Sequence, residues 1–130
     1  MADQLILIIE DNERNLKLVR DVLQFGGFRT AEARSAEDGL ALATSRPPDL
    51  VLMDLQLPGI DGMEAFRRLR ASPLTAEIPV VAVTAFAMKD DRERVLRAGF
   101  DGYLVKPISA RELPGQVRAF LTAKEPSDDR

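Results

Sequence analysis

The sequence lacks cysteine and histidine altogether, and it has a single tyrosine in 130 residues. Without cysteine, the chain has no disulfide framework, no thiolate metal site and no cysteine nucleophile. Without histidine, it cannot form a Ser-His-Asp triad, a histidine-ligated zinc site or a phosphohistidine. Any histidine that takes part in its chemistry must therefore come from a partner.

Long apolar runs and a strong charge of either sign are also missing. No apolar stretch approaches the length of a membrane span, and the start Met1-Ala2-Asp3-Gln4 lacks the basic residues of a signal peptide. We therefore expect a cytoplasmic protein. The net charge of −3 gives no footprint for nucleic acid. The arginines at 67, 68 and 70 are interpreted as a solvated helix face, so neither nucleic acid nor membrane is expected as a partner.

The composition that remains is typical of one folded domain. Hydrophobic residues make up 45% of the chain and charged residues 30%, which argues against disorder, and 130 residues suffice for a real core. We expect a single domain over residues 3–123 and a flexible, charged tail over residues 124–130, with no output domain.

Apolar runs of strand length alternate with amphipathic segments of helical period, which predicts five βα units. The expected strands are Leu5–Ile9, Phe28–Ala33, Leu50–Asp54, Pro79–Thr84 and Asp101–Val105. The expected helices run up to Gly26-Gly27, from Ser35 to Pro47-Pro48, over Met63–Arg70, over Asp90–Ala98, and from Ser109 towards Ala123. Strict alternation of this kind indicates a doubly wound α/β layer around a parallel sheet.

The last helix carries conflicting signals. Ser109 and Glu112 form a capping box, but Pro114-Gly115 follows at the expected second turn. Proline removes a backbone hydrogen bond there and glycine weakens the helix further. We therefore expect this helix to be kinked, late-starting or locally 3₁₀.

Charged residues stand just past the ends of three expected strands. Glu10-Asp11, Asp54 and Lys106 each follow an apolar run. The carboxyl ends of parallel strands share one edge of the sheet, where binding sites are built. Three carboxylates converging there would repel one another without a cation, so the pattern implies a hard divalent metal and a lysine that balances a further anion. We predict a phosphoryl-transfer site.

Each of these residues also has an ordinary structural explanation. Glu10 and Asp11 could cap the first helix, and Asp54 could be a helix N-cap or a loop acid. Lys106 could extend its ammonium into water, and Thr84 and Tyr103 could be packing residues of strands. Against this, a bare carboxylate that ends a buried strand is costly unless it is paired or functional. For Phe86 and Met88, core packing is favoured over an exposed docking patch.

Four motifs occur together in one order and carry a family resemblance. The chain resembles a response-regulator receiver domain of two-component signalling from about Leu5 to Leu121. The stretch Ile78 to Met88 is also similar to receivers of hybrid sensor kinases and to single-domain cell-cycle regulators. The motifs are Ile9-Glu10-Asp11-Asn12, Met53-Asp54-Leu55-Gln56-Leu57-Pro58-Gly59-Ile60-Asp61-Gly62, Val83-Thr84-Ala85 and Tyr103-Leu104-Val105-Lys106-Pro107. The resemblance implies a flavodoxin-like doubly wound (βα)5 fold with strand order 2-1-3-4-5.

The resemblance also implies an acceptor and a metal. Asp54 would accept the phosphoryl group as a carboxylate nucleophile. Asp11 and Asp54 would bind Mg²⁺ directly, Glu10 would act through water, and Gln56 would contribute its backbone carbonyl. Mg²⁺ keeps several waters and takes few carboxylates, which suits this sparse ligand set.

Further residues gain roles from the same resemblance. Lys106, aimed inward by a cis bond to Pro107, would pair with the phosphoryl group, which Thr84 and Ala85 would also bind. Tyr103 would be the switch aromatic that turns inward as Thr84 moves.

The function implied is that of a single-domain response regulator. A histidine kinase or a histidine phosphotransfer protein would supply the phosphoryl group. The chain would then switch a surface for a downstream protein target or pass the phosphate on in a phosphorelay. It would be no enzyme for outside substrates, because it would catalyse only its own phosphorylation and dephosphorylation. Many family members dimerise through the fourth helix, fifth strand and fifth helix, and Pro114-Gly115 argues against that dimer here.

Three alternatives stay open. The chain could be a receiver that docks without phosphorylation. It could be a phosphohydrolase with an aspartyl-phosphate intermediate, although such enzymes usually have a second acid where this chain has Gln56. It could also be a flavodoxin-like module for a nucleotide or flavin, although no GxGxxG or P-loop is present.

Overall fold

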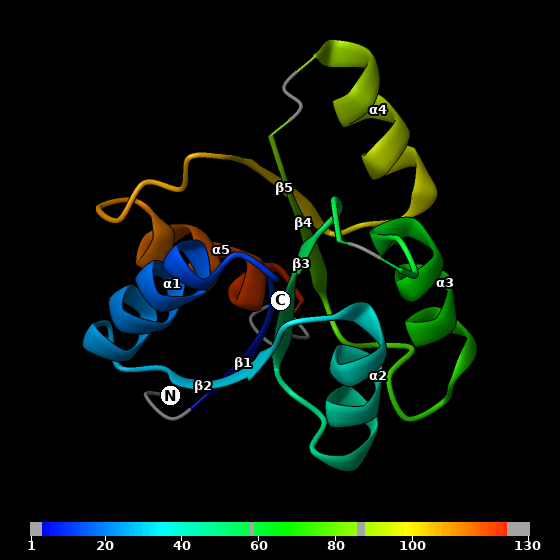
Figure 1. Cartoon of the computed structure of the whole chain (residues 1–130), viewed down its shortest axis with the longest axis horizontal. Helices are drawn as coiled ribbons and strands as arrows, with labels where there is room; N and C mark the ends of the chain where they lie inside the picture. Colours follow the sequence, from blue (N-terminus) through cyan, green and yellow to red (C-terminus); the bar gives the residue numbers. More distant parts are fainter. Residues whose placement is uncertain (1–3, 58, 86–87, 125–130) are drawn as a thin grey trace, which may run out of the picture.

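The computed structural model describes residues 4–57, 59–85 and 88–124. Within them, five strands and five helices alternate along the chain (Figure 1). The strands are β1 (Leu5–Ile9), β2 (Arg29–Ala33), β3 (Leu50–Asp54), β4 (Val80–Thr84) and β5 (Gly102–Val105). The helices are α1 (Glu13–Phe25), α2 (Ala36–Ser45), α3 (Gly62–Ala71), α4 (Lys89–Ala98) and α5 (Leu113–Lys124). The expected tail and Phe86 lie outside the described residues, apart from Lys124.

The strands form one parallel sheet in the order β2-β1-β3-β4-β5, which confirms the fold implied by the resemblance. The chain starts at β1, moves outward to β2 and then returns to β3 on the other side of β1. The strand order therefore reverses between β1 and β3. In open parallel sheets, ligand sites form outside the carboxyl ends of the strands at such a reversal.

Helices cover both faces of the sheet (Figure 1). One core cluster joins alternate strand residues to α2, α3 and α4, and the other joins the remaining strand residues to α1 and α5. All five residues of β1, β3 and β4 are buried. Strands buried on both faces read as continuous apolar runs, which is why the sequence predicted them well.

The helix starts explain several side chains near the sheet edge. Asn12 caps α1, since its Oδ1 accepts a hydrogen bond from Asn15 N at 3.0 Å. The interpretation of Glu10 and Asp11 as side-chain caps of this helix is therefore wrong, although Glu10 Oε2 accepts a hydrogen bond from the N–H of Asn12 at 3.1 Å. Ser35 caps α2 as expected, with its Oγ accepting from Asp38 N at 3.1 Å.

The last helix starts late. Glu112 N donates to Ser109 Oγ at 3.2 Å, but the helix itself begins at Leu113. Pro114 is thus the second residue of α5 rather than part of a second turn. Backbone N–H groups in a first turn have no partner within the helix, so proline costs little there.

The prediction of one solvated arginine face on α3 is wrong for Arg70. Arg67 and Arg68 are exposed and pair with Glu64. Arg70 donates instead to the carbonyl of Ile78 at 2.7 Å and to Asp101 Oδ2 at 2.8 Å. Arg70 stands nearest the end of α3, where Ile78 and Asp101 lie within reach of its guanidinium, and Arg67 and Arg68 find their partner within the helix instead.

Met88, expected in the core, is 71% exposed at the start of α4. Helix α4 is the most polar of the five, and Val95 is its one buried residue. A helix that buries so little has no room in the core for a residue that precedes it. Among the described residues, no helix has both the length and the apolar character needed to cross a membrane.

Candidate functional site

Backbone hydrogen bonds continue the sheet past the strand ends and fix where the polar residues leave it. Glu10 N donates to Ala33 O at 3.0 Å, Leu55 N to Val83 O at 3.0 Å, and Lys106 N to Thr84 O at 2.8 Å. The residues that follow β1, β3 and β5 are therefore held at one edge, the carboxyl edge of the sheet.

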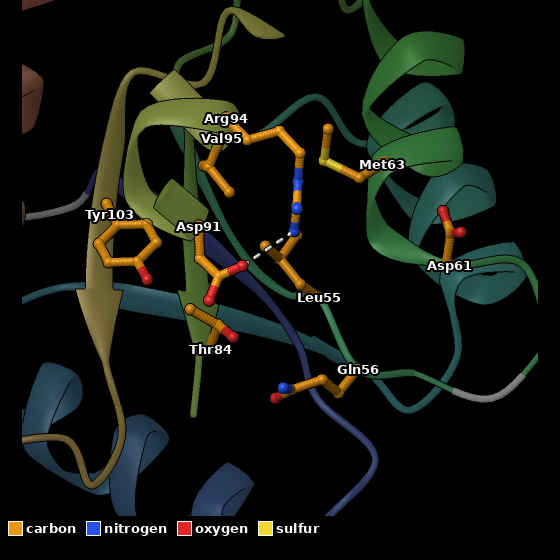
Figure 2. A pocket seen from close by; sticks show the side chains of 9 residues that line it. All are labelled: Leu55, Gln56, Asp61, Met63, Thr84, Asp91, Arg94, Val95 and Tyr103. Atoms are coloured by element: carbon orange, nitrogen blue, oxygen red, sulfur yellow. Dashed lines mark hydrogen bonds and ion pairs between the residues drawn. The ribbon is translucent and has the colours of Figure 1, made fainter. Parts of the chain in front are cut away.

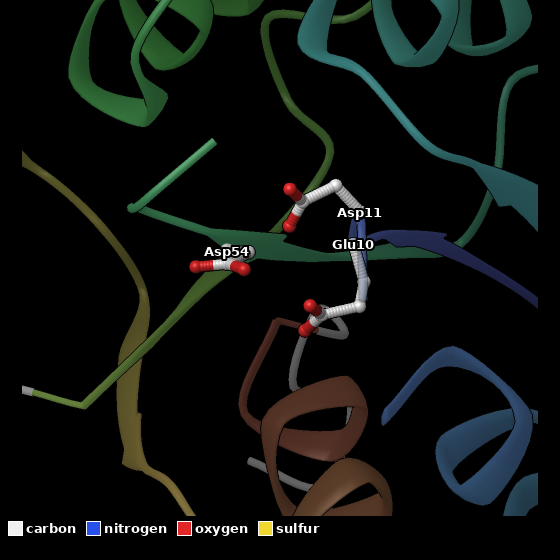
Figure 3. A group of neighbouring side chains, drawn as sticks. All are labelled: Glu10, Asp11 and Asp54. Atoms are coloured by element: carbon white, nitrogen blue, oxygen red, sulfur yellow. The ribbon is translucent and has the colours of Figure 1, made fainter. Parts of the chain in front are cut away.

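Three carboxylates meet at this edge (Figure 3). Glu10, Asp11 and Asp54 each offer an oxygen atom, and these atoms lie within 4.8 Å of one another. Glu10 is 4% exposed and Asp54 is 2% exposed, while Asp11 is partly exposed. Glu10 and Asp54 thus form the buried part of the cluster, and solvent reaches it on the side of Asp11.

Lys106 completes the cluster from the end of β5. Its Nζ lies 2.9 Å from Asp54 Oδ2 and 3.1 Å from Glu10 Oε1, and its side chain is 18% exposed. The ammonium therefore points inward rather than into water. The Lys106–Pro107 peptide bond is cis, as the resemblance implied. From the sequence we expected Lys106 to pair with a phosphoryl group. The structure shows that, without one, Lys106 forms ion pairs with Asp54 and Glu10.

Backbone groups hold the carboxylates in place. Gln56 N donates to Asp54 Oδ1 at 2.8 Å, and Asn12 N donates to Glu10 Oε2 at 3.1 Å. On the rim, Arg34 Nη2 donates to the carbonyl of Asp11 at 3.2 Å. No motif of the sequence drew attention to Arg34, because it comes from the loop after β2 and is remote in sequence from Asp11.

Burial and charge act in opposite directions on the two flanking groups. Burial raises the pKa of Glu10 above its usual value, the N–H of Asn12 opposes this, and the nearby charge of Asp54 adds to it. Burial alone would lower the pKa of Lys106, but its hydrogen bonds and charge contacts with Asp54 and Glu10 outweigh burial and raise it. Lys106 is therefore fully charged at neutral pH.

The donor set fits a hard divalent cation. Three carboxylates face one ammonium, so negative charge is in excess among these four groups. All the metal-facing donors are oxygens, the ligand type that Mg²⁺ prefers. The described residues thus provide both the charge and the chemistry for a magnesium ion.

Thr84 and Tyr103 lie on the side of α4. Thr84 is 2% exposed at the end of β4, and Tyr103 on β5 pairs in register with Ala82. Both line a cavity of about 130 Å³ that is also lined by Leu55 and Gln56 after β3 and by residues at the start of α3 and on α4 (Figure 2). Burial, reinforced by the charge of Asp91, raises the pKa of the Tyr103 phenol.

Gly62, the last residue of the second sequence motif, was given no role by the sequence. A Cβ atom at this position would lie 2.9 Å from Leu55 Cα and 3.1 Å from the carbonyl oxygen of Asp54. These are backbone atoms that cannot move aside, so only glycine lets α3 begin so close to the end of β3. The Asp61-Gly62 pair was the available signal, since Asp61 caps α3 by accepting from Glu64 N at 2.8 Å.

Replacing Glu10 with glutamine is expected to raise the free energy of unfolding at neutral pH in metal-free buffer. Because the folded-state pKa of Glu10 is raised, its stabilising contribution is complete below the unfolded value of 4.5 and is lost as the pH rises through the folded value. Urea unfolding between pH 4 and pH 8 measures this. The stability gap between Glu10→Gln and the wild type should widen with pH, and parallel curves would contradict the assignment.

Comparison with known proteins agrees with this geometry. The family model of the response regulator receiver domain matches residues 6–118. The polar-differentiation response regulator DivK of Brucella ovis is 43% identical over 116 residues, covering 89% of this chain and 94% of that protein. The DivK of Brucella anthropi is 42% identical over 116 residues, with the same coverage of both chains.

Solved structures agree as well. The receiver domain of the sensor histidine kinase PA1611 from Pseudomonas aeruginosa, with a magnesium ion coordinated in its active-site cleft, is 33% identical. It superposes with a TM-score of 0.84 and covers 92% of this chain and 98% of that one. A CheY-like receiver domain protein from Methanospirillum hungatei gives a TM-score of 0.85 at 28% identity, covering 94% of this chain and 96% of that one. Such domains act as phosphorylation-dependent switches, and this chain belongs to the response regulator receiver domain family of two-component signalling.

Proposed function

We propose that Asp54 accepts a phosphoryl group from a phosphohistidine of a histidine kinase or a histidine phosphotransfer protein. The observation that carries the proposal is the position of Asp54, 2% exposed at the end of β3, with Lys106 Nζ 2.9 Å from one carboxylate oxygen and Gln56 N 2.8 Å from the other. A carboxylate oxygen of Asp54 would attack phosphorus, the P–N bond to the imidazole would break, and an acyl phosphate would form. The imidazole leaves with the electron pair of the P–N bond, takes up a proton from solvent and stays with the partner, since this chain has no histidine.

The same carboxylates would hold Mg²⁺. Asp11 and Asp54 would be direct ligands, Glu10 would act through water, and Gln56 would offer its backbone carbonyl. The bound ion would neutralise the excess negative charge and orient the phosphoryl oxygens. The 4.8 Å spread of the three carboxylate oxygens supports this assignment.

Other groups of the chain would receive the phosphoryl oxygens. Lys106 would supply a point charge, and the Thr84 hydroxyl and the Ala85 N–H would donate from the end of β4. Aligned donors in a partly buried site stabilise a charge that water would otherwise solvate. As Thr84 moves towards Asp54, Tyr103 would turn into the cavity beside it and change the surface formed by α4 and β5.

The output would be a protein contact or the transfer of the phosphate to another histidine protein. Both routes begin with the same acyl phosphate on Asp54. The surface that changes includes Met88, Leu96 and Val105, which are 71%, 40% and 38% exposed. Exposed apolar side chains of this kind are suited to a protein partner.

Intact-mass spectrometry after incubation with acetyl phosphate, with and without Mg²⁺, tests the proposal. The wild type should gain one phosphoryl group only with Mg²⁺, and Asp54→Asn should gain none. Asp38→Asn serves as the matched control, since Asp38 is an exposed acid in the first turn of α2 and is not a member of the carboxylate cluster.

Two results would redirect the assignment. If a control receiver is phosphorylated but this chain gains no mass, the result supports a receiver that docks without phosphorylation. If the chain hydrolyses many equivalents of a generic phosphate ester, the result supports a phosphohydrolase instead of a phosphorylation switch.

A further inference from the structure

The side chain of Gln56 joins the two loops that flank the acceptor. Its Oε1 accepts a hydrogen bond from Ala85 N at 3.2 Å, while its own backbone N donates to Asp54 Oδ1 at 2.8 Å. One residue therefore contacts the acceptor carboxylate through its main chain and the end of β4 through its side chain. Figure 2 shows the carboxamide reaching from the loop after β3 to the side of Thr84.

The same N–H is the one that the proposed function assigns to a phosphoryl oxygen on Asp54, which pairs in register with Val83, two residues before Ala85. Ala85 follows Thr84, the last residue of β4, and Thr84 O already accepts from Lys106 N at 2.8 Å. The next backbone donor along this strand end is the Ala85 N–H, and it faces the loop that carries Gln56. Because the Ala85 N–H points at this loop, it cannot make a well-aligned hydrogen bond to the Gln56 carboxamide and to a phosphoryl oxygen at the same time.

We propose that Gln56 is a displaceable latch on the Ala85 N–H. In the unphosphorylated chain, the carboxamide holds Ala85, at the end of β4, against Gln56, just after β3. When Asp54 carries a phosphoryl group, one of its oxygens takes the N–H and the carboxamide leaves. This inference rests on the proposed function, because it assigns the regulation of the same acceptor. Gln56 acts here as a positioning residue through Ala85.

The energetics allow the exchange. A hydrogen bond between neutral groups at an exposed position contributes little, whereas one to a charged oxygen is roughly twice as strong. The phosphoryl oxygen therefore displaces the carboxamide, but the lost bond slows acceptance. Removing the latch is expected to speed phosphoryl acceptance by about 2- to 10-fold, the range that one neutral hydrogen bond supports.

Gln56→Met tests the latch, because methionine has a similar length and no comparable acceptor. Its rate of phosphorylation by phosphoramidate at saturating Mg²⁺ should exceed that of the wild type by the stated factor. The backbone carbonyl and N–H of residue 56 are kept, so Mg²⁺ affinity should not change. Gln24→Met is the matched control, since Gln24 is an exposed glutamine of α1 that bonds Thr30 and should leave the rate unchanged.

The backbone amide of Ala85 provides a second measurement. Its hydrogen exchange and its NMR resonance respond to loss of the Gln56 hydrogen bond itself, and not to a general change in stability. In the unphosphorylated protein, Gln56→Met should speed hydrogen exchange of this amide and shift its ¹H–¹⁵N resonance. After phosphorylation, the Ala85 resonances of wild type and variant should converge, because the phosphoryl group bonds the N–H in both.

The outcomes separate the two proposals. If wild type and Gln56→Met accept phosphate at equal rates, or if Ala85 exchange is the same in both, the latch is wrong and the acceptor assignment stands. If neither protein gains a phosphoryl group while a control receiver does, the proposed function is wrong and the latch fails with it.

Discussion

Replacing Lys106 with methionine is expected to slow phosphoryl acceptance at Asp54 by roughly 10²- to 10³-fold, the usual cost of losing one aligned donor to a developing charge. The ammonium lies 2.9 Å from Asp54 Oδ2, so it is already placed beside the attacking group. Methionine keeps the length and apolar stem of the side chain. The substitution therefore removes the charge and leaves most of the packing.

The same variant should also be less stable without metal. Lys106 pairs with two acids whose side chains are 6% and 2% exposed. Removing one partner of a buried ion pair leaves its charge uncompensated, which costs about 3 kcal/mol. Saturating Mg²⁺ should restore part of this loss, because an ion that binds only the folded state adds to its stability.

Phosphorylation rates and urea unfolding in EDTA and in Mg²⁺ measure both effects. Lys17→Met is the matched control, since Lys17 pairs with Asp21 on the surface with side-chain exposures of 67% and 48%. Exposed pairs contribute only about 0.2–1 kcal/mol, so this control should unfold nearly as the wild type does. A Lys106→Met protein that accepts phosphate at the normal rate would rule out a role for the ammonium in the transfer.

The fold was predictable because its strands are simple in sequence. β1, β3 and β4 are buried throughout, so each reads as an unbroken apolar run, and the expected strand Leu50–Asp54 matches β3 residue for residue. The gathering of the three carboxylates and Lys106 was predictable for the same reason, since charged residues at the carboxyl ends of such runs lie at one edge of the sheet. Parallel pairing then brings residues from distant parts of the chain together.

The partners of these residues were not predictable from local patterns. Lys106 and Asp54 are 52 residues apart, and Gln56 and Ala85 are 29 apart. Whether two such side chains are in contact depends on their rotamers and on the path of the loops, and the hydrophobic pattern of the sequence predicts neither. Arg70 illustrates the same limit, because its contact with Asp101 turns a residue of an apparently solvated face into a tie between α3 and the start of β5.

The second large effect is expected at Phe66, where alanine should lower the free energy of unfolding by about 3–5 kcal/mol. Phe66 is 4% exposed on α3 and stacks on Phe100 with ring centroids 4.0 Å apart and planes at 17°. The Arg70 guanidinium lies 4.7 Å from its ring centre. The substitution therefore opens a cavity and also removes an aromatic pair and a cation–π contact.

Urea unfolding measures the loss in the free energy of unfolding of Phe66→Ala. Phe25→Ala, the same substitution at an exposed phenylalanine, is the control. Phe25 is 96% exposed at the end of α1, so its truncation should change stability by no more than about 0.5 kcal/mol. Equal losses in the two variants would contradict the packing described for α3. A large loss confined to Phe66→Ala would show that the aromatic pair fastens α3 to the segment leading into β5. Helix α3 begins at Gly62 against the end of β3, so this packing also supports Asp54 at the end of that strand and the loop that carries Gln56.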